Sequence, residues 1–267
     1  MIKSLRALFA YKELLLNFAH KELKVKYKNS ILGFFWSLLN PIMMMLVFTF
    51  VFGVIFPVKS VPFFPIFLLA GLLPWNFFSA TVTGGTISIV ANSGLVKKVY
   101  FPRELLPISI GLANLVNFFL EMCVFLVFVL VLGFRYHSLW RAFLFLPYLL
   151  ILAPVLFVFS LGVALFVAAN NVYFRDVQHL VGIFLTVLFY GSPIIYDLKQ
   201  VPLQGSLLLM YKMNPLVTLI MSFKNAFYWG SSPHLSWLLY SLAAALLVFI
   251  AGYKVFLRLE PGFAEEI

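Results

Sequence analysis

The chain has 267 residues, of which 63% are hydrophobic and only 10% charged, and its mean hydropathy is +1.04. This composition excludes an ordinary soluble domain and predicts an integral membrane protein. The net charge of +10 does not indicate nucleic-acid binding, because the basic residues lie at the edges of apolar runs. There they suit cytoplasmic loops and anionic lipid headgroups. We therefore expect membrane lipids, and no nucleic acid, among its partners.

Residues 1–30 predict an amphipathic helix rather than a cleavable signal peptide. Polar and charged side chains recur on one face, and leucines and phenylalanines gather on another. The pattern is typical of a helix that lies in the membrane interface. The alternative is a cytoplasmic helix packed on a partner. The polar face consists of Arg6, Glu13, Asn17, His20, Lys24 and Lys28.

Six apolar runs approach the roughly 20 residues that cross a bilayer as a helix. Thirteen of the 19 Lys and Arg residues then lie on the side of both termini, which predicts cytoplasmic termini; the other six, Lys224 among them, lie on the opposite side. The predicted fold is an all-α integral membrane protein, with the interface helix (1–30) followed by a six-helix transmembrane domain (31–267). The runs are Leu38–Phe56, Phe63–Thr83, Ile108–Leu132, Ala142–Ala169, Val177–Ile195 and Leu235–Tyr253.

A charged island, residues 97–107, separates the second and third runs. Its sequence is Lys-Lys-Val-Tyr-Phe-Pro-Arg-Glu-Leu-Leu-Pro. Two basic residues, an aromatic pair and an Arg-Glu pair between prolines predict a structured cytoplasmic element rather than a solvated linker. A second island, 171–177, lies between the fourth and fifth runs. Its Arg175-Asp176 pair either caps the fifth helix or forms a second contact surface.

The segment 197–234, between the fifth and sixth runs, is apolar in two short pieces, Val201–Tyr211 and Leu216–Trp229. Each piece is too short to cross a bilayer and is interrupted by prolines. Re-entrant backbone is tolerated only where protein or a water-filled cavity surrounds it. The segment is therefore expected to form short re-entrant helices at the outer end of a pathway.

Three polar residues share one face of the third run, namely Asn114, Asn117 and Glu121, at steps of three and four. A charge at the centre of a bilayer costs at least about 2.5–3.5 kcal/mol, so Glu121 is expected to face protein or water, or to be protonated. One interpretation is a proton-coupling site or a polar pathway lining. The other is hydrogen bonding between helices. No intramembrane Lys, Arg or His partner for Glu121 is evident from the sequence.

Aromatic residues are frequent, at 18% of the chain. In the first run they fall at i, i+4 and i+8, which forms a stripe on one helical face. Such a stripe either packs in the core or against lipid, or lines a conduit in which sugar rings stack. The candidate conduit residues are Phe48, Phe52 and Phe56 in the first run and Phe189, Tyr190 and Tyr196 near the end of the fifth.

Motifs of several enzyme classes are absent. There is no G-x-x-x-x-G-K-[ST] phosphate loop, no H-E-x-x-H zinc motif and no G-x-S-x-G nucleophile elbow. The single cysteine, Cys123, lies in an apolar run, and no Cys/His cluster has metal-ligand spacing. We therefore expect a chain that is not an enzyme by itself and that holds no metal and no cofactor.

Several segments together resemble the permease subunits of ABC-type polysaccharide exporters. They are Lys26-Tyr27-Lys28-Asn29-Ser30-Ile31-Leu32-Gly33 with Trp36 and Asn40-Pro41, then 100–107, 173–177 and Asn214-Pro215-Leu216, and the tail segments 256–258 and 263–265. The resemblance covers nearly the whole chain, and its motifs are specific in combination. The family often has Arg where this chain has Lys26 and Lys28, and Lys binds phosphate as a point charge rather than bidentately.

The resemblance implies a homodimer, served by two copies of a separate subunit that binds ATP and Mg. It also implies that 97–107 is a coupling helix seated in that subunit and that 197–234 forms outer gate helices. The implied coupling residues are Tyr100, Phe101, Pro102, Arg103, Glu104, Phe174, Arg175 and Asp176. Recruitment of the lipid-diphosphate head is assigned to Lys24, Lys26, Tyr27 and Lys28.

The function expected from these features is ATP-driven export of a lipid-linked polysaccharide, O-antigen first, across the inner (plasma) membrane. Within the same class, teichoic acid, capsule or another substrate are alternatives. A second class is a proton-coupled secondary transporter that uses Glu121. A third is a membrane-embedded enzyme acting on lipid-linked glycans, which the missing site residues disfavour.

Overall fold

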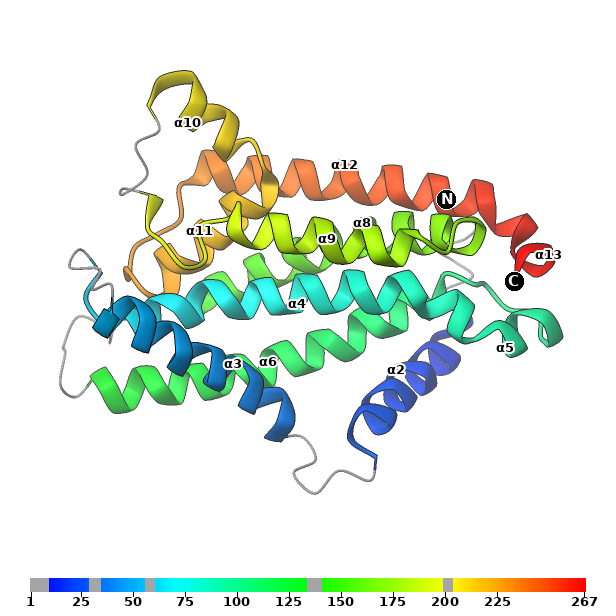
Figure 1. Ribbon diagram of the computed structural model, residues 1–267, viewed down its shortest axis with the longest axis horizontal. Helices are drawn as coiled ribbons and strands as arrows, with labels where there is room; N and C mark the ends of the chain where they lie inside the picture. Colours follow the sequence, from blue (N-terminus) through cyan, green and yellow to red (C-terminus); the bar gives the residue numbers. More distant parts are fainter. Residues whose placement is uncertain (1–9, 29–34, 56–60, 134–140, 199–203) are drawn as a thin grey trace.

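The computed structural model describes residues 10–28, 35–55, 61–133, 141–198 and 204–267, and these residues form helices and turns without any strand. Figure 1 shows the long helices running side by side. Three short helical turns, η1, η3 and η5, adjoin longer helices. The helices are α2 (Lys12–Tyr27), α3 (Phe35–Thr49), η1 (Phe50–Ile55), α4 (Phe64–Ala91), α5 (Ser93–Lys98), α6 (Leu105–Gly133), α7 (Arg141–Leu144), η3 (Leu146–Tyr148), α8 (Leu149–Tyr173), α9 (Val177–Tyr190), α10 (Gly205–Lys212), α11 (Pro215–Phe227), α12 (Leu235–Leu259), η5 (Glu260–Gly262) and α13 (Phe263–Glu266).

Four helices among the described residues are long and apolar enough to cross a membrane, namely α4, α6, α8 with η3, and α12 with its C-terminal extension. They confirm the second, third, fourth and sixth predicted runs. A fifth span arises if α10 and α11, bent by 88°, are counted as one. The first and fifth runs appear as shorter apolar helices, Pro41–Phe50 and Val177–Tyr190. The prediction of six spans therefore stays a prediction.

The fifth run ends earlier than predicted. Helix α9 has 14 residues and stops at Tyr190, so at 1.5 Å per residue it is about 21 Å long, shorter than the roughly 30 Å hydrocarbon core. The apolar sequence continues to Ile195, but Pro193 cannot donate the backbone hydrogen bond that a helix would need there. Hydrophobicity alone overestimated the length of this helix, because the apolar sequence continues into the turn after Tyr190.

Helix α4 lies at the centre of the bundle (Figure 1) and packs on α8, α6, α11, α3 and α9. Its residues from Ile66 to Leu73 are almost entirely buried, as expected for a helix that is apolar on all sides and enclosed by others. The polar residues of its second half, Thr81 and Thr86 among them, are buried as well. Helices α6 and α8 are thus positioned directly against α4, whereas α12 packs on α8 and α11.

Helices α8 and α12 approach each other most closely at two glycines. A Cβ atom placed on Gly252 would lie 2.0 Å from the carbonyl oxygen of Gly162, and one placed on Gly162 would lie 2.6 Å from the backbone of Phe249. Small residues at such a crossing let two backbones touch, which is how helices associate in membranes without a hydrophobic driving force.

The two ends of the bundle differ (Figure 1). The α10 end carries α10 and α11, where Pro215 follows Asn214 and the Asn214 side chain accepts a hydrogen bond from the Leu216 amide at 3.0 Å. The α13 end carries α5, α13 and the start of α2. There a second buried cluster joins α2, α6, α8, α12 and α13 around residues such as Phe101, Phe256 and Phe263.

The predicted coupling helix 97–107 is not one helix, which corrects its shape. Helix α5 ends at Lys98, its C-cap Val99 is extended (φ −127°, ψ 135°), and α6 begins at Leu105. Pro102 disfavours a helical conformation for Phe101 before it, so residues 99–104 form a turn. The island therefore consists of the end of α5, this turn and the start of α6.

Candidate functional site

The polar stripe of α6 faces helix α2. Between them lies an open cavity of about 220 Å³, lined by Glu22, Leu23, Val25 and Lys26 of α2 and by Ile110, Ala113, Asn114 and Asn117 of α6. The spacing of 114, 117 and 121 brings their side chains to one side of α6, and α2 packs along that side. The structure therefore brings together residues that the sequence analysis kept apart: Lys26 of α2 and the polar residues of α6.

Glu121 has a basic neighbour that lies outside the predicted membrane runs. Lys26 and Glu121 interact electrostatically across α2 and α6. Partial burial lowers the pKa of Lys26, and the Glu121 carboxylate opposes this shift. The sequence analysis missed the pair because it depends on how α2 folds back against α6. The amide of Asn114 also reaches the Thr81 hydroxyl of α4, at 3.5 Å, as expected for polar contacts between helices.

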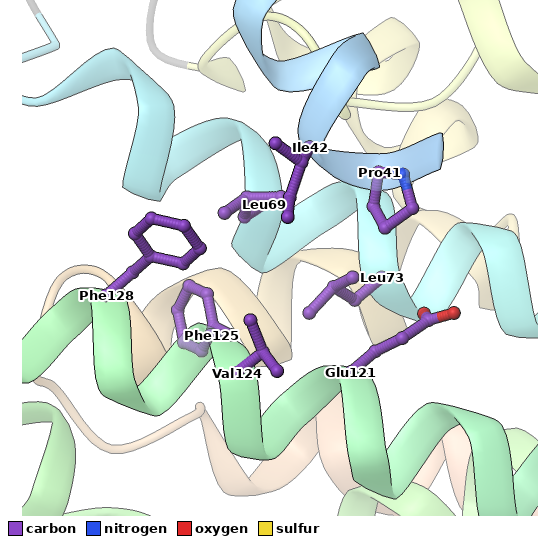
Figure 2. Close-up of a pocket in the computed structure, with 8 residues that line it drawn as sticks. All are labelled: Pro41, Ile42, Leu69, Leu73, Glu121, Val124, Phe125 and Phe128. Atoms are coloured by element: carbon purple, nitrogen blue, oxygen red, sulfur yellow. The ribbon is translucent and has the colours of Figure 1, made fainter. Parts of the chain in front are cut away.

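Glu121 does not line the cavity between α2 and α6 but borders a separate, small apolar hollow of about 10 Å³. Figure 2 shows the Glu121 side chain at one end of this hollow and Phe128 at the other, with Pro41 and Ile42 of α3 above them. Leu69 and Leu73 of α4 complete the lining. Glu121 therefore lies about one helical turn beyond Asn117, the last α6 residue that lines the α2–α6 cavity, at the edge of this apolar hollow.

The other basic residues of α2 do not line the α2–α6 cavity. Lys24 and Lys28 are exposed. Lys21 donates a hydrogen bond to the Asn92 side chain at 3.1 Å, which ties α2 to the junction of α4 and α5. The side chain of Tyr27 lies outside the described residues, as does the predicted helix over residues 1–9.

The predicted coupling residues of the first island divide into exposed and buried ones. Tyr100 is 95% exposed. Phe101 is buried and packs on Phe18 of α2, with 5.7 Å between ring centroids. Pro102 is half-buried. Tyr100 is thus the most exposed aromatic residue of this turn and is available to a partner.

Arg103 and Glu104 point into the chain itself. The Arg103 amide donates to the Glu260 carboxylate at 3.2 Å, and its guanidinium donates to the Glu260 carbonyl oxygen. Glu104 is 2% exposed and accepts a hydrogen bond from the Tyr253 hydroxyl at 3.2 Å. Both residues therefore fasten the turn 99–104 to the end of α12.

The second island lies at the same end of the bundle. Phe174, Arg175 and Asp176 are exposed. The preceding Tyr173 donates to the Leu259 carbonyl oxygen at 2.9 Å, and its ring packs on Phe263 at 6.3 Å. The C-terminal segment 259–263 thus contacts the turn 99–104 on one side and the end of α8 on the other.

The candidate conduit rings come together from separate helices. Phe48 stacks on Phe52 at 6.2 Å and on Phe189 of α9 at 6.3 Å. Phe189 also contacts Trp75 of the central helix at 5.5 Å. Most of these rings are half-buried against one another, which suits the packing interpretation within one chain. Tyr190 is exposed, Tyr196 shares a 2.9 Å hydrogen bond with Tyr211, and Phe56 lies outside the described residues.

Two residues with prominent contacts were not selected from the sequence. Glu260 holds Arg103, and the sequence carries little sign of it beyond its place after a long helix. Lys224 is buried inside α11 and donates to the carbonyl oxygens of Pro193 and Ile194. A single Lys within an apolar run is a signal that could have found it, because buried charges are costly and rarely occur without a role.

The long apolar helices and the polar groove between α2 and α6 define a multi-pass membrane protein. The chain belongs to the family of ABC-2 type transporters, whose family model matches residues 13–228. It is 37% identical over 269 residues to the O-antigen export system permease protein RfbA of Myxococcus xanthus, with 100% of each chain covered.

Two further relatives are similar over most of the chain. The O-antigen export system permease protein RfbA of Klebsiella pneumoniae is 31% identical over 253 residues, which are 95% of this chain and 94% of the relative. The polysialic acid transport protein KpsM of Escherichia coli is 27% identical over 205 residues, 75% of each chain. The resemblance to ABC-type polysaccharide export permeases is thereby confirmed.

Proposed function

We propose that this chain is the permease subunit of an ABC exporter that moves lipid-linked O-antigen across the inner membrane. The observation that carries this proposal is the 37% identity to an O-antigen export permease over the full length of both chains. ATP and Mg are bound by a separate subunit, two copies of which serve a homodimer of this chain. The chain itself supplies the path and the surfaces that the ATP-binding subunits move.

In this proposal the chain crosses the membrane six times. The two crossings beyond the four long helices are supplied by α3 with η1 and by α9 together with the apolar turn that follows it, while α10 and α11 form a re-entrant pair. The α13 end faces the cytoplasm, in keeping with its basic residues, among them Lys97, Lys98 and Arg175. Helix α2 then lies along the cytoplasmic interface, where the exposed Lys24 and Lys28 meet anionic headgroups.

The cavity between α2 and α6 receives the diphosphate head of the lipid-linked substrate. Lys26 supplies a positive charge at its wall, and the amides of Asn114 and Asn117 supply hydrogen-bonding groups. The cavity is open, and it lies at the depth where a lipid headgroup would reside if α2 lies in the interface. The glycan then passes the aromatic rings of α3 and α9, where Phe48, Phe52 and Phe189 gather.

The ATP-binding subunit contacts the exposed residues of both islands. Tyr100 of the turn 99–104 and Phe174 of the second island offer aromatic side chains, with Arg175 and Asp176 beside them. Exposed aromatic residues are frequent anchors of protein interfaces. Arg103 and Glu104 act indirectly, by holding the turn on the C-terminal segment.

The test of this function is complementation. A strain that lacks its own O-antigen export permease receives this chain together with the ATP-binding subunit encoded beside it, and O-antigen at the cell surface is measured by immunoblot. We expect surface O-antigen to return only when both subunits are present. Surface O-antigen that remains absent, although both subunits are present and associated, would contradict the proposed substrate.

The Lys26→Met variant should bind a lipid diphosphate more weakly. A hydrogen bond to a charged group contributes about 1.5–3 kcal/mol, so we expect about 10- to 100-fold weaker binding of farnesyl diphosphate by the purified full-length chain. Glu121→Gln should shift binding in the opposite direction, because it removes a negative charge close to the ligand.

Lys254→Met is the control, since Lys254 is exposed on α12 and does not line the cavity. If Lys26→Met and the wild type bind farnesyl diphosphate equally well, Lys26 does not contribute to the head-group site. Glu121→Gln also separates the transporter classes: ATP-driven export should persist in this variant, whereas a proton-coupled transporter would lose activity.

A further inference from the structure

Lys224 of α11 carries a buried ammonium group, and only 4% of the residue is exposed. Its Nζ donates to the carbonyl oxygens of Pro193 and Ile194, the latter at 2.8 Å, and the Tyr196 carbonyl oxygen lies at 3.5 Å. The Nζ atom also lies 3.4 Å from the centroid of the Phe67 ring. A buried cation needs partners of this kind, because it is strongly destabilising once they are lost.

These partners come from two elements other than α11, namely the turn after α9 and the central helix α4. The carbonyl oxygens belong to the turn that follows α9, beyond its last residue Tyr190. Phe67 belongs to the central helix α4. The same helix leaves room for the lysine stem at Gly71, where an added Cβ would lie 2.7 Å from the Lys224 Cε atom. Lys224 therefore joins α11, α4 and the end of α9 at one point.

Other hydrogen bonds also hold α10 and α11 in place, and one of them joins Thr218 of α11 to Ser241 of α12. The Tyr228 hydroxyl donates to the Pro62 carbonyl oxygen, and Tyr211 of α10 pairs with Tyr196 at 2.9 Å. Asp197 interacts electrostatically with Lys224 from the same turn. Helices α10 and α11 are themselves bent by 88°, which is the geometry of a broken span or a re-entrant loop.

We propose that Lys224 is a positioning residue that holds the outer end of the transport path closed, an inference that rests on the proposed function. While its ammonium is bonded to the turn after α9, α11 is fixed against α4 and α9. Opening requires the ammonium to leave these carbonyl oxygens, so that α11 separates from the end of α9. The hydrogen bonds of Lys224 are either formed or broken, so the closed and open positions of α11 are two discrete states. A conformational switch requires such discrete states.

The test is passive leakage. The full-length chain and its ATP-binding partner are reconstituted in liposomes loaded with a small anionic dye, and dye release is measured without ATP and without O-antigen. In Lys224→Met the side chain keeps its length but loses its donors, so the pairing that favours the closed state is lost. We expect release about tenfold faster than in the wild type, because the open state is a minor one that this loss makes more populated.

Two pairs of variants keep the result interpretable. Gly71→Ala keeps the charge but displaces the Lys224 stem, so release should also rise. Gly182→Ala on α9 meets nothing within 4 Å and should not change release. Lys212→Met on α10 removes a cation near the Trp237 ring and should likewise leave release unchanged.

Wild-type release in folded Lys224→Met and Gly71→Ala complexes would overturn the inference. If the Lys224→Met complex does not assemble, Gly71→Ala alone tests the inference. Faster dye release then supports it, and wild-type release overturns it. The measurement uses neither substrate nor ATP. Leakage in these variants from a complex that fails to restore surface O-antigen would therefore leave the role of Lys224 intact while rejecting the proposed substrate.

Discussion

Tyr100→Ala is expected to weaken the association of this chain with its ATP-binding subunit by about 30-fold, or about 2 kcal/mol, the loss typical of an aromatic anchor at an interface. Tyr100 is 95% exposed, while its neighbour Phe101 is buried against Phe18. An exposed ring on a turn held by its neighbours loses little conformational freedom on binding. The affinity is measured with purified full-length subunits in detergent.

Tyr190→Ala is the matched control, since Tyr190 is also exposed but lies on α9, away from the turn. Its affinity for the ATP-binding subunit should equal that of the wild type. An unchanged affinity for Tyr100→Ala in a folded chain would exclude Tyr100 from the contact surface. Replacing Arg103 or Glu104 should reduce association only together with stability, because these residues bind the C-terminal segment.

Gly252→Ala is expected to lower the yield of folded chain severely. The new Cβ would lie 2.0 Å from the Gly162 carbonyl oxygen, so α8 and α12 must separate. Overpacking typically costs 1–3 kcal/mol, and a backbone-to-backbone clash leaves no flexible side chain to yield, so we expect a loss of about 3 kcal/mol or more. Against a total stability of about 5–15 kcal/mol this is a large fraction. Gel filtration and thermal unfolding in detergent measure it.

Gly182→Ala again provides the comparison, because no atom lies within 4 Å of the added methyl group. Alanine favours a helix over glycine by about 0.5–1 kcal/mol, so this variant should be as stable as the wild type or slightly more so. A Gly252→Ala chain that unfolds at the wild-type temperature would mean that α8 and α12 do not meet at these glycines.

The sequence predicted the long transmembrane helices best, because hydrophobicity alone is enough to locate them. Long apolar runs located α4, α6, α8 and α12, because a helix is the structure that satisfies its own backbone inside a bilayer. Prolines caused the errors. Pro193 ended α9 within an apolar run, and Pro102 turned the predicted coupling helix into a turn. Both effects are local and could have been weighed from the sequence.

The parts of the site that were missed depend on tertiary contacts. The stripe Asn114, Asn117 and Glu121 follows from helical spacing, so the sequence was sufficient to predict it. That Lys26 lies beside Glu121 depends on the packing of α2 on α6, which periodicity does not encode. The inward direction of Glu104 likewise depends on Tyr253, 149 positions later in the chain. The sequence therefore identified the polar and charged residues of the site, but it did not identify the residues that each of them contacts.

The C-terminal segment holds the turn 99–104 in place, so some contacts of this turn can form only late in protein synthesis. Arg103 and its partner Glu260 are 157 residues apart in the chain. At about 5–20 residues per second, a ribosome needs roughly 8–30 seconds to travel from one to the other. During that interval the turn lacks its hydrogen bonds to Glu260 and Tyr253. Under the proposed function, the surface offered to the ATP-binding subunit would therefore be complete only after α12 and the C-terminal segment have been made.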